Sequence, residues 1–322
     1  MLISDLLRDM RMSFVPAPQA CFGTLDPTAS SALSAAIVQA APFLSLLSVL
    51  GVDDPNAPLF DPIKAKLRTG RKAQGRFLVP ASPTKQSHEY QDFDSSVIWT
   101  WQQLSQLLAG MNQQQTNKLL EGLALAAFGD DILRVGFRGQ RAATNTDPVA
   151  NPNGEDVALG WPALAKAADP EGKRVLNRTV VFDTTGGGDY ADLDTMAYEL
   201  VALLPEVYRN DPRLRVLVGS DLLRAHKQAY LKPGAVRDKQ QRMKIADLPT
   251  LTSQHMPGTY FALTFTENLQ VLTVNHTHRL SVSDLGDDAA WGVRYNRAQA
   301  YGLGEPTAYA AFDAITLATT EE

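Results

Sequence analysis

The sequence predicts an α+β fold, and three stretches with different periodicity support this prediction. Apolar residues recur at helical spacing over 117–128, and the pattern extends over 101–133. After residue 178, short apolar runs alternate with helical stretches, which is typical of α/β segments. Beyond residue 249 the chain turns to short strand-like runs separated by turn residues. With 322 residues, the chain is long enough for two domains with a full core.

The composition excludes several classes of protein. Hydrophobic residues make up 44% of the chain and charged residues 20%, unlike a disordered, collagenous or coiled-coil chain. The single cysteine, Cys21, excludes an intramolecular disulfide framework and a multi-cysteine zinc site, and it favours a reducing compartment. A net charge of −5 argues against a protein that wraps nucleic acid.

The N-terminal residues predict a short amphipathic helix rather than a secretory signal. Acidic residues interrupt any apolar core, at Asp5 and Asp9. The apolar positions have helical spacing instead: Leu2, Leu6, Leu7 and Met10.

Residues 27–52 contain no charge, but too many polar side chains for a membrane span. We predict a buried helix that begins with Thr28 or Ser30 as its cap and ends at Pro42. A buried strand over 43–50 should follow.

A basic segment without acidic residues comes next. Its six cationic residues are Lys64, Lys66, Arg68, Arg71, Lys72 and Arg76. Gly70 and Gly75 lie among them, so we predict a glycine-jointed hairpin or loop that projects from the body. Its return arm is a predicted strand over 90–101.

The second half of the chain predicts alternating strands and helices. The expected elements are a strand at 179–183, a glycine turn at 186–189, a helix over 190–208, a strand at 215–219, a helix capped by Ser220 or Asp221, and strands at 259–265, 269–274, 292–299 and 307–316. A Glu267-Asn268 turn should join the third strand to the fourth.

A second basic run follows the strand at 215–219. It contains Arg224, Lys227, Lys232, Arg237, Lys239, Arg242 and Lys244, with Asp238 as its one acidic residue. The whole chain nevertheless has a net charge of −5, so the remainder is strongly acidic. An acidic body with two basic segments suits contacts between copies of the chain, although each run alone could equally be a solvated face.

The glycine cluster offers the best enzymatic hypothesis. A strand, the turn Gly186–Gly188 and a helix could present backbone N–H groups to a phosphate. The sequence lacks the lysine of a P-loop and the spacing of a dinucleotide fingerprint, and Asp189 would repel an anion. A structural turn is therefore favoured over a phosphate site.

Other candidate chemistry is weak. His276 and His278 would share one face of a strand and could hold a metal, but no third ligand has suitable spacing, so surface histidines are favoured. Adjacent carboxylates lie beside turn signals, at Asp53-Asp54, Asp130-Asp131 and Asp287-Asp288. The sequence predicts no catalytic site, metal or cofactor.

Several long blocks, in order, resemble the major capsid proteins of Peduovirus-type temperate tailed phages. The blocks are residues 22–52, 155–164, 186–231 and 245–282. Their distinctive points are Gly188-Asp189-Tyr190, Asp211-Pro212, Leu248-Pro249 and His278-Arg279.

The resemblance implies the Hong Kong 97-type capsid fold. It assigns an N-terminal arm to 1–55, an extended loop to 56–98, a peripheral domain with a spine helix to 99–165 and 275–322, and an axial domain to 166–274. The basic segment then falls in the extended loop, and the second run in the axial domain.

The function implied is that of a major capsid protein. Such a protein self-assembles into hexamers and pentamers of an icosahedral shell around double-stranded DNA, with scaffold, portal and decoration proteins as partners and no membrane. The implied location is the virion, with assembly in the cytoplasm of the bacterial host. The alternative is an α/β enzyme that binds a phosphorylated ligand at Gly186–Gly188.

Overall fold

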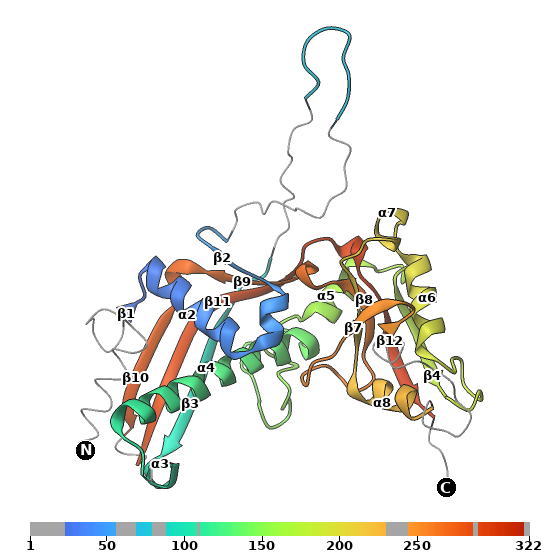
Figure 1. Ribbon diagram of the computed structural model, residues 1–322. Helices are drawn as coiled ribbons and strands as arrows, with labels where there is room; N and C mark the ends of the chain where they lie inside the picture. Colours follow the sequence, from blue (N-terminus) through green and yellow to red (C-terminus); the bar gives the residue numbers. More distant parts are fainter. Residues whose placement is uncertain are drawn as a thin grey trace. The chain divides into compact units, whose positions relative to one another are not determined.

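The computed structural model describes residues 23–55, 69–78, 88–107, 110–229, 244–285 and 289–318. These residues form two compact units, each built around a six-stranded sheet (Figure 1). The first unit takes its residues from 1–57, 88–135 and 271–301, and the second from 58–87, 136–270 and 302–322. The predicted N-terminal helix and Cys21 lie outside the described residues.

The first sheet has the strand order β1-β10-β11-β9-β2, and β3 also pairs with β11. The strands are β1 (Gly23–Thr24), β2 (Ser48–Val52), β3 (Gln91–Thr100), β9 (Leu269–Val274), β10 (Arg279–Leu285) and β11 (Ala290–Leu303). β3 and β11 run antiparallel over ten residue pairs, from Gln91–Gln299 to Thr100–Ala290. The predicted return arm is therefore confirmed as a strand of this sheet.

Helix α2 (Pro27–Ala40) confirms the predicted helix, but only one face of it is buried and its cap differs from the prediction. The Asp26 carboxylate accepts the Ala29 N–H at 2.8 Å, so the cap precedes both Thr28 and Ser30. Pro27 explains the difference, because proline fits the first helical position and the capping side chain comes just before it. The strand predicted over 43–50 begins only at Ser48, after the 3₁₀ helix η1 (Pro42–Leu46), and it is not buried as predicted, since Leu50 and Gly51 are exposed.

Two further helices follow β3, namely α3 (Trp101–Leu107) and α4 (Gln113–Arg138). The buried stripe of α4 consists of Leu120, Ala124, Phe128 and Ile132, spaced four residues apart. The apolar spacing predicts an inward stripe of Leu119, Leu120, Leu123, Ala124 and Ala127. Leu120 and Ala124 are buried as predicted, but Leu123 is 42% exposed. The period was thus predicted correctly, but the buried face is centred on Leu120 and Ala124.

The second sheet has the order β4-β12-β8-β5-β7-β6. Its strands are β4 (Val175–Phe182), β5 (Leu214–Val218), β6 (Lys244–Ile245), β7 (Leu248–Leu251), β8 (Phe261–Phe265) and β12 (Ala310–Leu317). β12 is parallel to β4 and antiparallel to β8, so the sheet is mixed.

Four helices belong to the second unit. They are α5 (Trp161–Ala168), α6 (Leu193–Leu203), α7 (Glu206–Arg209) and α8 (Ser220–Ala229). The single helix predicted over 190–208 is therefore two helices, and Pro205 separates them because it cannot donate the N–H that a continuous helix needs. The buried face of α6 packs into the core beside β8 and β12.

Asn268 fixes the turn after β8, within the 3₁₀ helix η3 (Thr266–Asn268). Its side-chain Nδ2 donates to Thr264 Oγ1 at 2.9 Å and to the Glu305 carbonyl at 3.1 Å. Its Oδ1 accepts the Glu305 N–H at 2.6 Å. Asn268 is fully buried, so its side chain takes the place of water as a hydrogen-bond partner of the Thr264 hydroxyl and of the Glu305 N–H and carbonyl.

The C-terminal strands belong to different units. β10 and most of β11 lie in the first unit, whereas β12 lies in the second. The assignment of arm, extended loop, peripheral domain and axial domain stays a prediction. None of the described helices has the length and apolarity needed to cross a bilayer.

Candidate functional site

The predicted basic projection is described over residues 69–78, drawn in cyan in Figure 1. Arg71, Lys72 and Arg76 are exposed there, as are all their described neighbours. A Cβ on Gly70 would lie 2.5 Å from the Phe77 ring, so the two ends of this segment touch. The segment therefore folds back on itself, as predicted, but none of its ten residues is in a strand. Lys64, Lys66 and Arg68 lie outside the described residues.

The second basic run is described only at its two ends. Arg224 and Lys227 are exposed on α8, and Lys244 is exposed on β6. Arg224 lies 3.5 Å from the Asp221 carboxylate, one turn away. The other residues of the run lie outside the described part of the chain: Lys232, Arg237, Lys239 and Arg242.

Carboxylates close in sequence accept hydrogen bonds from backbone N–H groups at the glycine turn and beside it. Asp183 accepts the Thr185 N–H at 2.8 Å and the Gly187 N–H at 3.0 Å. On the other side of the turn, Asp189 accepts the Val181 N–H at 2.8 Å. Of the N–H groups that a phosphate would need, that of Gly187 is therefore already bonded to an anion, and that of Gly186 donates to the Asp183 carbonyl.

The turn also lies along the edge of β4. The Asp189 and Tyr190 N–H groups donate to the Val181 carbonyl, and the Asp183 N–H donates to the Tyr190 carbonyl. Helix α6 begins only at Leu193, with Asp192 as its cap, so the glycines are not at a helix N-terminus. This arrangement supports the structural turn and gives no support to a phosphate site.

Replacing Gly188 with alanine is expected to lower the free energy of unfolding by about 2 kcal/mol, an overpacking cost. A Cβ at this position would lie 2.6 Å from the Val181 carbonyl oxygen, which is backbone and cannot turn aside. Urea denaturation of unassembled subunits measures the effect.

Gly122→Ala provides the matched control for this substitution. Gly122 is exposed in α4, and a Cβ there would meet no atom within 4 Å. Alanine should therefore stabilise that helix by up to about 1 kcal/mol. Equal effects of the two substitutions would contradict the packing argument at Gly188.

The two histidines of 276–278 do not share a strand face. His276 is exposed in the 3₁₀ helix η4 (Asn275–Thr277), whereas His278 is fully buried. The prediction of paired surface histidines is therefore wrong. The 3₁₀ turn breaks the two-residue alternation on which that prediction depended.

His278 belongs to a buried polar cluster in the first sheet. Its Nδ1 lies 2.8 Å from the Tyr295 hydroxyl, and burial together with the nearby Arg297 lowers the pKa of His278 to about 4. The Arg297 guanidinium donates to Gln299 at 2.7 Å and to Ser95 at 3.0 Å. Tyr295, Arg297 and Gln299 alternate along β11, so they lie on one face of that strand. His278 and Ser95 come from other parts of the chain, and their contacts with this face could not be predicted from spacing.

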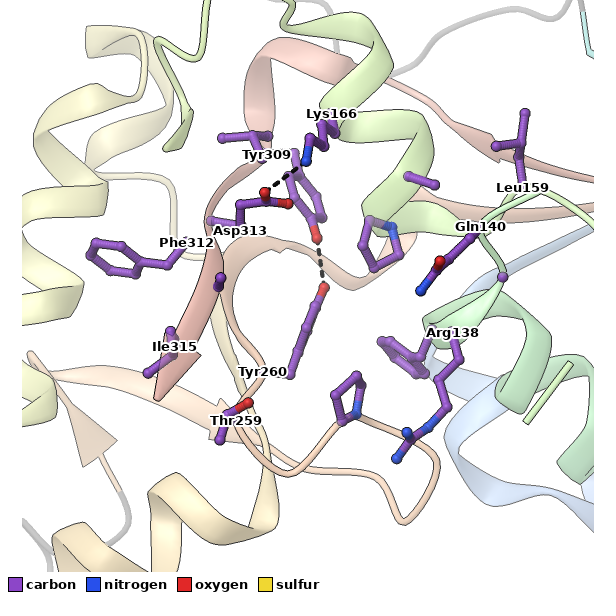
Figure 2. Close-up of a pocket in the computed structure, with 18 of the residues that line it drawn as sticks. Arg138, Gln140, Leu159, Lys166, Thr259, Tyr260, Tyr309, Phe312, Asp313 and Ile315 are labelled. Carbon is purple, nitrogen blue, oxygen red and sulfur yellow. Dashed lines mark hydrogen bonds and ion pairs between the residues drawn. The ribbon is translucent and has the colours of Figure 1, made fainter. Parts of the chain in front are cut away.

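A cavity of about 870 Å³ lies within the second unit, between α5, β12 and the loop before β8 (Figure 2). Apolar side chains make up much of its wall, and two pairs of its polar side chains contact each other. The Tyr260 and Tyr309 hydroxyls lie 2.6 Å apart, and Lys166 Nζ lies 2.7 Å from the Asp313 carboxylate.

The two tyrosine hydroxyls of the cavity are poor bases. Burial raises the pKa of both Tyr260 and Tyr309, so neither hydroxyl acts as a base near neutral pH. The described residues that line it include no histidine, cysteine or serine. Over the part of the chain that the structure describes, no group of three metal-ligating side chains gathers.

A family comparison decides the class of protein. The family described as phage major capsid protein, P2 family, matches residues 17–315, which include almost all of both sheets. The chain belongs to this family. Membership in the P2 family makes the chain a structural protein of a phage capsid and confirms the resemblance stated above.

Relatives of this P2-family chain support the same conclusion. The capsid proteins of Escherichia phage P2 are 29% identical over 174 residues, which is 48% of this chain and 47% of the relative. The aligned region thus spans about half the length of that relative. A chain from the procapsid of satellite phage P4, solved with the size determination (Sid) protein, superposes with a TM-score of 0.75 at 18% identity. The superposition covers 92% of this chain and 94% of the P4 procapsid chain. This likeness establishes the Hong Kong 97-type capsid fold.

Proposed function

We propose that this protein is the major capsid protein of a tailed phage and assembles into the icosahedral shell that encloses its double-stranded DNA. The observation that carries the proposal is the family match over residues 17–315. In this proposal the building blocks are hexamers and pentamers of the chain. In this proposal the protein works through the contacts that its fold makes between copies, and it is not an enzyme.

The described structure suits repeated weak contacts between copies. Two compact units supply firm surfaces, and the exposed segment 69–78 carries Arg71, Lys72 and Arg76. Since the rest of the chain is acidic, these cations can meet carboxylates of a neighbouring copy. Each contact can be weak, because many identical contacts close one shell.

The proposal includes further partners and a location. A scaffold protein, a portal and decoration proteins would contact the shell, and packaged DNA would be enclosed without sequence preference. The shell would assemble in the cytoplasm of the bacterial host and remain in the virion. In this arrangement 56–98 act as an extended loop and 166–274 as an axial domain.

Expression of the chain with its scaffold tests the proposal directly. Negative-stain images and sedimentation should show closed particles or capsomers. A strictly monomeric species at high concentration, with scaffold present, would contradict it. Titration with nucleotides separates the enzymatic alternative, for which binding at Gly186–Gly188 would be required.

Charge reversal in the basic segment is expected to reduce assembly without unfolding the subunit. The variant Arg68→Glu, Arg71→Glu, Lys72→Glu replaces three cations whose individual contacts are each worth only about 0.2–1 kcal/mol. The loss recurs at every copy, so the yield of particles should fall steeply at low salt. Sedimentation across a salt series measures the yield.

A matched control reverses three basic residues outside both runs, at Lys118, Arg141 and Lys173. All three are exposed in the structure. If both triple variants lose the same yield, the effect is one of net charge and the proposed role of the basic segment is wrong.

A further inference from the structure

One surface segment carries no charge. Residues 95–117 contain no aspartate, glutamate, lysine or arginine, although charged residues make up 20% of the chain. They form the end of β3, all of α3 and the start of α4, and Figure 1 shows α3 where β3 ends and α4 begins. An uncharged stretch of this length is expected in a core, yet most of its described residues are exposed.

Large apolar side chains are exposed along this segment. Four of them are 38 to 48% exposed: Ile98, Trp101, Leu107 and Met111. Amide and hydroxyl side chains are exposed around them: Gln102, Gln103, Ser105, Gln106, Asn112, Gln114 and Gln115. We call these eleven residues the neutral patch. Protein interfaces typically have a core that is rich in aromatic residues and methionine and poor in charge, surrounded by a polar rim. The neutral patch has the same composition.

Negative charge is missing from this segment even at the helix N-termini, where the helix dipole favours it. At the start of α3, the Gln103 side chain accepts the Thr100 N–H at 2.9 Å, and the Thr100 hydroxyl accepts the Gln103 N–H at 3.3 Å. At the start of α4, Asn112 and Gln115 repeat this box, with both bonds at 3.0 Å. Glutamate fills the same role in such boxes and is also favoured by the helix dipole. Both boxes nevertheless use glutamine.

We propose that the neutral patch is a contact surface for a second copy of this chain. Each copy has a net charge of −5, so copies repel wherever their acidic surfaces meet. A surface without charge can be desolvated against another copy without leaving an unpaired ion. The choice of a second copy as the partner rests on the proposed function, in which many copies must meet.

The test uses glutamates that the helix caps can accept. Gln103→Glu with Gln115→Glu keeps both capping boxes, so the melting temperature of the unassembled subunit should stay the same or rise. Particle yield with scaffold at matched concentration should fall at least tenfold, because the two added charges would be buried at the contact. Val149→Glu with Asn177→Glu is the control, since it adds the same charge at exposed positions of the second unit.

The outcomes are distinct. Wild-type yield from the capping-box variant would overturn the inference, as would an equal loss from the control. A lower melting temperature of the isolated variant would also overturn it, because the patch would then be covered within its own chain. Gln102→Glu with Gln106→Glu, which leaves the caps untouched, should reproduce the defect. Failure of the wild-type chain to assemble would instead contradict the proposed function.

Discussion

Replacing Asn268 with alanine is expected to lower the free energy of unfolding by roughly 4 kcal/mol. The substitution removes three hydrogen bonds, which join Asn268 to the Thr264 hydroxyl and to the N–H and carbonyl of Glu305. The Glu305 carbonyl keeps its bond from the Ala308 N–H. Asn268 and Thr264 are both fully buried, so water does not replace the lost bonds without cost. Urea denaturation of unassembled subunits at pH 7, followed by tryptophan fluorescence, measures the change.

Asn177→Ala is the matched control, because Asn177 is exposed on β4. Its effect should stay within about 0.5 kcal/mol. A change of less than 1 kcal/mol for Asn268→Ala would show that the turn after β8 does not depend on this side chain.

Acidification is expected to destabilise the subunit through His278. Burial first, and then the positive charge of Arg297, lower the pKa of His278 in the folded chain to about 4, whereas an unfolded histidine has the ordinary value of 6.5. Between these two pH values the unfolded chain binds a proton that the folded chain does not. Stability therefore falls as the pH falls, by up to 1.4 kcal/mol per unit and about 3 kcal/mol in total.

The two histidines of 276–278 provide the comparison. His278→Gln keeps an acceptor for the Tyr295 hydroxyl but cannot titrate, so unfolding free energies measured from pH 7.5 to 4 should lose this part of their slope. His276 is exposed, so His276→Gln should keep the slope of the wild type. An unchanged slope in His278→Gln would exclude this histidine as the cause.

Local signals predicted much of the fold. Apolar runs located β4, β5, β8 and β9, and helical spacing located α4 and α6. Most of the boundaries that were wrong involve a proline, as at Pro27 before the expected cap and at Pro205 inside the expected helix. β10 was missed, because polar residues alternate with apolar ones along it, so it lacks the continuous apolar run that marked the other strands.

The candidate sites were less predictable, because they depend on contacts between distant residues. Residue types alone left the glycine turn open, and it was the position of Asp183 that decided against an anion. The burial of His278 depends on its contact with Tyr295, 17 residues further along the chain, and no spacing revealed this contact. The roles of the two basic runs stay a prediction.

The position of β12 has a consequence for synthesis. β4 pairs with β12 and with no other described strand, although 127 residues separate Phe182 from Ala310. A ribosome that stops before Ala310 therefore releases a chain whose β4 lacks its neighbour and whose core lacks Phe312 and Ile315. Such chains expose apolar strands and become substrates for proteases. β12 thus acts as a check on synthesis of the second unit, because β4 is left without its partner strand in any chain that stops before Ala310.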